Sequence, residues 1–423
     1  MASAYGLSKS KLTSFEQCAR KLWLSKHRPE LEVVDDDSQA RFATGHEVGA
    51  LACALLPNGV MVDAEPDLGA AISRTRELID GGWRQPIFEA TFEHDGVLVR
   101  VDVLSPDGEG WSIAEVKSST SVKDYHLGDL ATQVWVLRET GVEVTSASIR
   151  HIDNRFRLQA AGDYAGVFKD SERFAEIGDK LADRAEIVAR ARAVLAGDEP
   201  VLTTGDHCSA PFSCGFTDYC RSKEPPGPDW PISLLPRGKV TAVKWADQGV
   251  FDLREVPSGG FGNATYERIR EATVSGIVYH DRDGARAATS AWSLPRAYLD
   301  FETVNPAIPR WIGTKPFQQI PFQYSCHLED AHGAFRHRAF LSLDAGDPRR
   351  ALAEQLVIDV GGESCRSIIA YNAPFEKLCV RELAAVFPDL KPQLEEIENK
   401  IVDLLPVTRD HYYHRDQRGS WSI

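Results

Sequence analysis

Two acidic residues and a lysine in the first half of the chain have the spacing of a hydrolytic metal site. Asp102 lies in one apolar stretch, after Arg100-Val101, and Glu115-Val116-Lys117 ends the next. Because side chains alternate along a strand, Glu115 and Lys117 lie on one face. Two carboxylates on adjacent strands can hold Mg²⁺ or Mn²⁺, while a neighbouring lysine orients the attacking water and offsets phosphate charge. The alternative is salt bridging on a strand surface.

A second set of residues consists of cysteines. Cys208, Cys214 and Cys220 recur every six residues in a loop that contains Pro and Gly, and the chain has no Cys-x-x-Cys knuckle. Three thiolates need a fourth ligand, for which Cys18 is the candidate. Zinc and unrelated free thiols are the alternatives to an iron-sulfur cluster. The other four cysteines are expected to be small buried residues: Cys53, Cys326, Cys365 and Cys379.

A third set lies near the C-terminus, in Tyr298-Leu299-Asp300-Phe301-Glu302. Alternation puts Asp300 and Glu302 on one face and the apolar residues between them on the other. Paired carboxylates at this spacing are typical of two-metal sites, where two cations hold the attacking and leaving oxygens of a phosphodiester.

The residues around the first motif predict the elements that must hold it. Alternating apolar residues separated by turns predict a three-stranded meander over 87–93, 97–104 and 111–117. A helix over 124–139 and a returning strand over 143–152 follow. This succession predicts a mixed α/β fold with the two acidic residues on neighbouring strands.

Further helices are predicted before and after these strands in the sequence, over 8–27, 39–56 and 171–196. The first of them contains Cys18. Within residues 1–28 there are six lysines and arginines and one acid, Glu16, which indicates a local positive patch or a solvated helix face.

Breaks in the pattern predict the domain organisation. Five prolines between 221 and 238 predict a boundary near 225. We expect a first domain over 1–224, a Pro-rich linker and helical appendage over 225–295, and a second α/β domain over 296–423. His411, His414 and Asp416 are expected to belong to a solvated polar tail, with the alternative that they act as ligands in the site of Asp300 and Glu302.

Length and charge narrow the class of protein. The chain has 423 residues and a formal net charge of -14, so it is expected to fold around more than one core and to lack a general positive field for nucleic acid. The start has no apolar signal region, and no stretch of about 18 apolar residues follows. We therefore expect a cytoplasmic protein without a membrane segment, in which clustered cysteines bind metal or carry out redox chemistry instead of forming disulfides.

The first motif, followed by a helix that bears Gln133, resembles the PD-(D/E)XK nuclease superfamily in its RecB-like branch. The resemblance implies that Asp102 and Glu115 bind the metal and that Lys117 is the catalytic lysine. It implies that Gln133 contacts substrate or organises the site. The tyrosine that usually follows four residues later is Leu137 here.

The same resemblance implies accessory metal ligands upstream of the meander. The branch uses a histidine after a glycine, and His46 follows Gly45. Glu89, on the neighbouring predicted strand, is the second candidate. Mg²⁺ or Mn²⁺ is the implied cofactor.

The cysteines resemble the iron-sulfur staple of CRISPR-associated RecB-like exonucleases and of AddB-type helicase-nucleases. In those proteins one cysteine precedes the nuclease core and three follow it. The run from Lys11 to Leu24 matches the helix that carries the first cysteine. The resemblance implies a [4Fe-4S] cluster on the four cysteines named above, Cys18, Cys208, Cys214 and Cys220.

The C-terminal part resembles DnaQ-like exonucleases, which have an RNase H-like fold. Asp300 and Glu302 match the first motif, Glu376 in Asn372-Ala373-Pro374-Phe375-Glu376 matches the second, and Asp403 begins a third. The family's last acidic residue would lie beyond residue 423. We therefore expect an incomplete DnaQ-like α/β domain after a PD-(D/E)XK core with helical flanks and an Fe-S loop.

Together these resemblances imply a metal-dependent DNA nuclease that acts in repair or defence. The activity expected first is that of an exonuclease on single-stranded DNA or frayed ends. Two other functions stay open. One is a non-catalytic Fe-S module that binds nucleic acid or senses redox state. The other is a 3′ to 5′ exonuclease that acts on RNA or DNA through the C-terminal site. The sequence does not indicate a protein partner.

Overall fold

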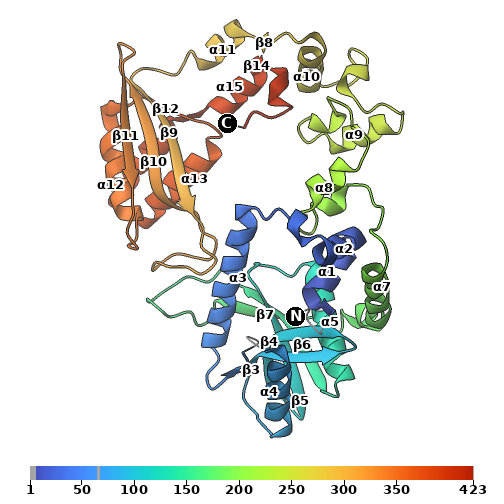
Figure 1. Cartoon of the computed structure of the whole chain (residues 1–423). Coiled ribbons are helices and arrows are strands. Elements are labelled where there is room, and N and C mark those ends of the chain that lie inside the picture. The colour runs from blue at the N-terminus through green and yellow to red at the C-terminus, as the bar shows by residue number, and fades with distance from the viewer. Residues whose placement is uncertain (1–5, 64–66, 423) are drawn as a thin grey trace. The chain divides into compact units, whose positions relative to one another are not determined.

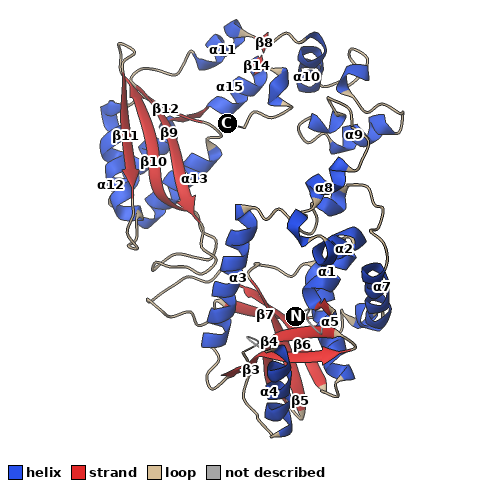
Figure 2. Cartoon of the chain, in the orientation of Figure 1, coloured by secondary structure: helices blue, strands red, loops and turns tan. Residues whose placement is uncertain are grey.

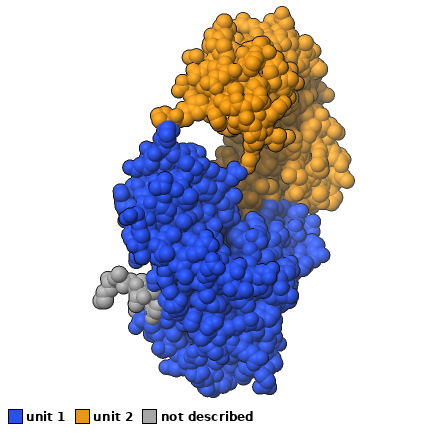
Figure 3. Space-filling view, turned by 90° about the vertical axis from the view of Figure 1, so that its right-hand side faces the viewer, with its two compact units in different colours: residues 1–225, 306–318 blue, residues 226–305, 319–423 orange. Residues whose placement is uncertain are grey.

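The computed structural model describes residues 6–63 and 67–422. The chain forms two compact units, coloured separately in Figure 3: unit 1, residues 1–225 and 306–318, and unit 2, residues 226–305 and 319–423. The division at 225 lies beside the boundary predicted after 224. The segment Pro306–Gln318 was predicted to belong to the C-terminal domain but is part of unit 1.

Unit 1 is built on a seven-stranded mixed sheet (Figure 1). Its path runs β2-β3-β4-β5-β6-β7, and β1 pairs with β4. The meander β3-β4-β5 is antiparallel, and β6 joins β5 in parallel. The strands are β1 (Leu7–Ser8), β2 (Val60–Met61), β3 (Ile87–His94), β4 (Val97–Asp107), β5 (Gly110–Lys117), β6 (Val144–Ile152) and β7 (Phe168–Glu172).

The helices of unit 1 differ from the prediction in one respect that matters for the site. The helix expected over 8–27 is two helices, because Cys18 between them is extended, with φ -164° and ψ 119°. The helix expected over 171–196 is shorter, since β7 occupies its start. The helices are α1 (Lys9–Gln17), α2 (Ala19–His27), α3 (Asp36–Ala54), α4 (Leu68–Asp80), α5 (Asp124–Glu139), α6 (Gly178–Ala182), α7 (Arg184–Ala196) and α8 (Thr217–Ser222).

The main core of unit 1 forms where α5 covers the meander. Buried side chains of β4, such as Val99 and Val101, pack with Leu130 and Val134 of α5. A smaller apolar cluster joins Val48 and Ile152 to Ala307 and Ile308, which explains why 306–318 belongs to this unit. Burial of these apolar surfaces holds the segment in place.

Unit 2 contains a five-stranded sheet in the order β11-β10-β9-β12-β13. The neighbours β9, β10 and β11 are antiparallel, while β12 and β13 run parallel to β9. A two-stranded sheet, β14-β8, is separate. The strands are β8 (Tyr279–His280), β9 (Arg296–Val304), β10 (Ile320–Glu329), β11 (Phe335–Leu341), β12 (Ser367–Ala370), β13 (Ile401–Asp403) and β14 (Tyr412–Tyr413).

Helices cover one face of this sheet, where Leu299 and Phe301 of β9 pack with Leu356 and Val380. They include α12 and α13, beside the sheet in Figure 1. The helices of unit 2 are α9 (Lys239–Ala246), α10 (Ala264–Ser275), α11 (Arg282–Thr289), α12 (Arg349–Val360), α13 (Pro374–Val386), α14 (Lys391–Lys400) and α15 (Leu404–His411).

The stretch predicted as a linker and appendage has a core of its own. Ile232, Leu253 and Ile269 are buried there together with Tyr413 and Trp421. These two aromatic residues, from the last part of the chain, close the apolar cluster. The prolines had suggested exposed chain, but the apolar residues between them are what this core buries.

Helices and strands occur in both units, so the chain is a mixed α/β protein as predicted (Figure 2). Among the described residues, none of the helices combines the length and the apolar character that crossing a membrane requires.

Candidate functional site

The first candidate site lies where β4 and β5 separate. Their regular pairing begins at Val103 opposite Ala114, so Asp102 and Glu115 come just outside the ladder. There a side chain takes the place of a backbone acceptor: the Asp102 Oδ2 atom accepts a hydrogen bond of 2.7 Å from the Val116 backbone N–H. The end of the ladder thus places the two predicted carboxylates beside each other.

Glu115 is the centre of the site, and its side chain is only 3% exposed. Oε1 lies 2.9 Å from the Lys117 ammonium and 2.5 Å from that of Lys9. Oε2 accepts from Gln133 Nε2 at 2.7 Å. The structure therefore brings Glu115, Lys117 and Gln133 together with Asp102, from β4, β5 and α5.

The surroundings shift the pKa values of the Asp102 and Glu115 carboxyl groups in opposite directions. Burial and the neighbouring Glu115 carboxylate raise the pKa of Asp102 to about 7. Burial would also raise the pKa of Glu115, but Lys117 and Lys9 reverse this and hold it well below its usual range. Burial would lower the pKa of Lys117, but Glu115 and Asp129 raise it, so Lys117 is a cation.

Sequence reasoning missed two residues of this site. Lys9 pairs with Glu115, and Asp129 lies 2.7 Å from the Lys117 ammonium and accepts a 2.7 Å hydrogen bond from Thr13. Asp129 precedes Gln133 by one helical turn, so its place on the same face of α5 was a usable signal. Lys9 had no comparable signal, because its position depends on β1 pairing with β4.

The predicted accessory ligands lie in other surroundings. His46 is exposed on α3. Glu89 lies opposite Asp102 on β3, at a left-handed backbone position with φ 53°, and pairs with Arg100 at 2.6 Å. Within the described ranges 6–63 and 67–422, no three His, Cys, Asp or Glu side chains form a group that could hold a metal ion. Nonetheless Asp102 and Glu115 are oxygen donors of the kind that Mg²⁺ and Mn²⁺ take, and buried Gln133 Oε1 has no hydrogen-bond partner.

A groove of about 1180 Å³ opens over Glu115 and Lys117. Basic side chains outnumber acidic ones in its lining by six to four. Its lining also includes aromatic side chains, among them Tyr125 and Phe212, whose rings meet edge to face at 4.7 Å. The basic residues are Lys9, Lys21, Arg41, Lys117, Lys123 and Lys315. A groove with this lining suits a polyanionic strand with stacking bases.

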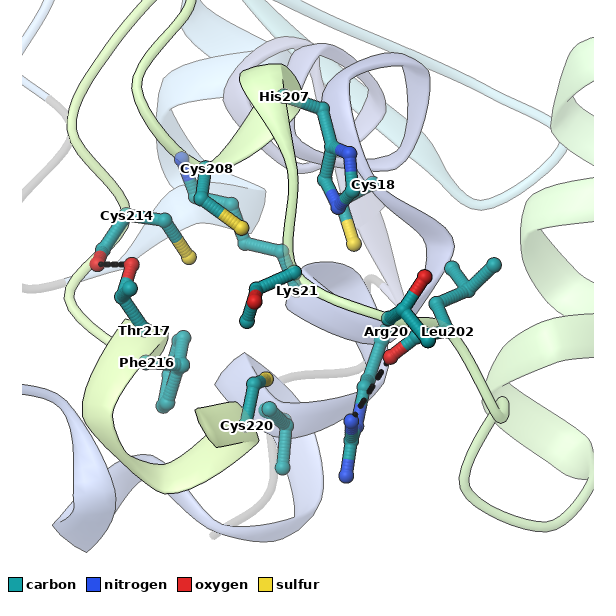
Figure 4. A pocket seen from close by; sticks show the side chains of 13 residues that line it. Cys18, Arg20, Lys21, Leu202, His207, Cys208, Cys214, Phe216, Thr217 and Cys220 are labelled. Carbon is teal, nitrogen blue, oxygen red and sulfur yellow. Dashed lines mark hydrogen bonds between the residues drawn. The ribbon is translucent and has the colours of Figure 1, made fainter. Parts of the chain in front are cut away.

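The four predicted cluster cysteines line one pocket (Figure 4). Cys18 reaches it because the backbone is extended between α1 and α2. Burial raises the pKa of Cys214 and of Cys220, and the other thiols of the group add to this. Four thiols are the number and type of ligands that a [4Fe-4S] cluster takes, but as placed here they are not among any group of three or more His, Cys, Asp or Glu side chains of the described residues that could hold a metal ion.

The cysteine loop also forms part of the groove wall. Gln17 Nε2 donates to the carbonyls of His207 and Phe212, both at 2.7 Å, and so ties the loop to α1. Cys214 lines both the thiol pocket and the groove. The other four cysteines lie elsewhere; Cys326, Cys365 and Cys379 are buried as expected, and Cys53 is half-buried.

A second acidic cluster occurs in unit 2. Asp300 and Glu302 lie on the exposed face of β9, opposite the residues that enter the hydrophobic core of unit 2, as the alternation predicted. The register of β12 and β13 pairs Ala370 with Asp403, and α13 follows β12 and carries Glu376. Burial raises the pKa of Glu376 to about 7, and the Asp300 and Asp403 carboxylates add to the effect.

Glu376 is only 3% exposed and its Oε2 has no hydrogen-bond partner, which fits a residue that serves as a ligand of a cation. Neither His411, the last residue of α15, nor His414 completes this site. His411 pairs with Asp281 at 2.9 Å, and His414 caps the turn that follows it.

We expect Glu376→Gln to stabilise unit 2 near pH 8, by about 2 to 3 kcal/mol. The folded protein holds the Glu376 proton more tightly than the unfolded chain, so wild-type stability falls as pH rises from about 4.5 through about 7. Glutamine has no proton to lose. Urea unfolding without divalent cations, near pH 4 and near pH 8, measures the difference.

The difference should vanish near pH 4, where the wild-type residue is neutral. Glu395→Gln is the matched control, because Glu395 is exposed on α14. Equal effects of Glu376→Gln at both pH values would contradict the burial argument.

Comparison with known proteins adds little to this geometry. Residues 297–422 match a family described as a domain of unknown function, DUF2779. No curated protein matches the chain. A solved structure described as "Crystal structure of SSO0001" is similar at 15% identity and a TM-score of 0.22, over 52% of this chain and 87% of that one.

Proposed function

We propose that unit 1 is a metal-dependent nuclease that hydrolyses phosphodiester bonds in single-stranded DNA or frayed ends, in the cytoplasm. The observation that carries the proposal is the convergence of Asp102, Glu115, Lys117 and Gln133 beside a basic groove. Salt bridging on a strand surface does not explain a Glu115 side chain that is 3% exposed and has a polar partner on each oxygen.

Each residue of the site has its own proposed role in phosphodiester hydrolysis. Asp102 and Glu115 would hold the divalent cation, which supplies Lewis acidity toward the phosphate and the attacking water. Lys117 is held as a cation by Glu115 and Asp129, which suits it to offset charge that develops on the phosphate. Gln133 fixes the orientation of Glu115.

The four cysteines would hold a [4Fe-4S] cluster with a structural role. A cluster on Cys18 and on Cys208, Cys214 and Cys220 would join α1 and α2 to the loop that walls the groove. Closing so long a loop lowers the entropy of the unfolded chain and so stabilises the fold.

A second candidate activity belongs to unit 2. The buried carboxyl of Glu376, with an unpartnered oxygen and two acidic neighbours, supports a 3′ to 5′ exonuclease site that takes Mg²⁺ or Mn²⁺ and acts on DNA or RNA. Asp300, Glu302, Glu376 and Asp403 would form this site.

Cleavage of 5′- and 3′-labelled single strands with Mn²⁺ or Mg²⁺ tests both candidates in the full chain. We expect cleavage that a chelator abolishes, and a loss of about 100-fold or more for Asp102→Asn but not for Asp300→Asn. Asp107→Asn, on the same strand as Asp102, is the matched control.

The reverse pattern, with Asp300→Asn inactive and Asp102→Asn active, would assign the activity to unit 2. If the wild-type chain cleaves no strand with either cation, both assignments fail. Binding that survives in that case would favour the non-catalytic module.

A further inference from the structure

Lys9 reaches the carboxylate site from the start of the chain. Leu7 and Ser8 form β1, which pairs in parallel with Val97 and Leu98 of β4. Ser8 then caps α1, so Lys9 is the first residue of that helix. Because buried Leu7 anchors β1, the backbone of Lys9 is fixed close to the end of the meander.

Lys9 and Lys117 share a single oxygen of Glu115. The Lys9 ammonium lies 2.5 Å and the Lys117 ammonium 2.9 Å from Oε1. The other oxygen accepts from the Gln133 amide. Both oxygens of the proposed metal ligand are therefore engaged, and two positive charges already lie against it.

The two lysines are held differently. Lys117 has a second acid, Asp129, at 2.7 Å. Glu115 is the one acid that pairs with Lys9 in the part of the chain that the structure describes. Both lysines line the groove and are about equally exposed, Lys9 at 21% and Lys117 at 20%. Because Asp129 holds Lys117 as well, Lys9 is the lysine that has only the Glu115 ion pair to break when it turns toward a ligand in the groove.

We propose that Lys9 keeps the metal site closed in the free protein and moves to a phosphate oxygen of the bound strand, so that strand and cation bind cooperatively. This inference rests on the proposed function, because it takes Glu115 as a ligand of the cation. Glu115 must exchange the Lys9 ammonium for the cation, and a phosphate in the groove offers Lys9 another anionic partner. By linkage, a strand that strengthens cation binding is itself bound more tightly when the cation is present.

The test measures Mn²⁺ binding to the full chain without DNA, by calorimetry or by the electron paramagnetic resonance of free Mn²⁺. We expect Lys9→Met to bind Mn²⁺ about tenfold more tightly than wild type, the ratio that corresponds to ~1.4 kcal/mol. Methionine keeps an unbranched apolar side chain in place of the lysine stem, and Lys117 and Gln133 still bind Glu115. Lys9→Gln, a polar replacement, should give the same result if the charge is what matters.

Lys11→Met is the matched control. Lys11 lies on the same helix, and its ammonium donates to the Gly6 carbonyl instead of entering the site. It should leave Mn²⁺ affinity at the wild-type value. Equal thermal melting of the proteins shows that each is folded.

Two results would overturn the inference: equal Mn²⁺ affinity of wild type, Lys9→Met and Lys9→Gln, or an equal gain for Lys11→Met. Asp102→Asn separates this failure from failure of the proposed function. If Mn²⁺ binds the wild type and Asp102→Asn loses it, the metal site stands and only the role of Lys9 fails. If no protein of the series binds Mn²⁺, both fail.

Discussion

Replacing Lys117 by alanine is expected to lower the rate of strand cleavage by about 10²- to 10⁴-fold, the range for loss of a positioned catalytic group. Lys117 is the cation beside both Glu115 and Asp129, at 2.9 Å and 2.7 Å. Its removal leaves two acidic groups without their common partner, next to the place where the proposed reaction would develop charge on the phosphate. The measurement is single-turnover cleavage of a labelled strand with saturating Mn²⁺.

The loss should be in the chemical step and not in strand binding, because the groove keeps five other basic side chains. Fluorescence anisotropy with the same strand checks this. Lys169→Ala, an exposed lysine on β7, is the control for removing one positive charge. Cleavage by Lys117→Ala at the rate of Lys169→Ala would contradict the role given to Lys117.

Cys18→Ser is expected to abolish the iron-sulfur cluster and to destabilise unit 1 by about 2 to 5 kcal/mol, the usual effect of removing a cross-link that closes a long loop. Cys18 would be the one ligand that precedes strands β2 to β7 in the sequence, and the other three follow β7. Its loss would remove the covalent link from α1 and α2 to the cysteine loop and leave the hydrogen bonds of Gln17 to hold the loop to α1. Anaerobic purification followed by a visible spectrum, iron and sulfide content, and thermal unfolding measures both effects.

Cys53→Ser is the matched control, because Cys53 is a half-buried thiol of unit 1 outside the pocket. It should keep iron, sulfide and colour. A wild-type protein purified without oxygen that contains neither iron nor sulfide would contradict the cluster. Zinc in its place would point to the alternative that the sequence left open.

The sequence was sufficient to predict the elements that carry strong local patterns. Alternation identified β3, β4 and β5, and the apolar stripe identified α5 with the bounds that the structure has, Asp124–Glu139. Asp102, Glu115 and Gln133 lie on these elements, but the expectation that they form one site came from the resemblance of their motif to a nuclease family. For Asp300 and Glu302, alternation along β9 predicted the shared face.

Features that depend on distant pairing could not be predicted in this way. The helix break at Cys18 lies inside a continuous apolar repeat, so the sequence pattern does not predict it. In the structure, the extended residue places Cys18 in the pocket with the three cysteines of the loop. Lys9 enters the site through the pairing of β1 with β4, and a two-residue strand has no periodicity to detect. Proline content suggested a linker after 224, but the residues there are buried with Tyr413 and Trp421.

The segment Pro306–Gln318 has a consequence for how this protein can change over generations. It is encoded between two strands of unit 2, yet Ala307 and Ile308 complete an apolar cluster of unit 1. The region that matches DUF2779, residues 297–422, contains it entirely. Recombination that exchanged the first half of the gene at codon 225 would separate Val48 and Ile152 from their packing partners. An exchange of sequence at that point would therefore remove packing contacts of unit 1 along with the replaced half.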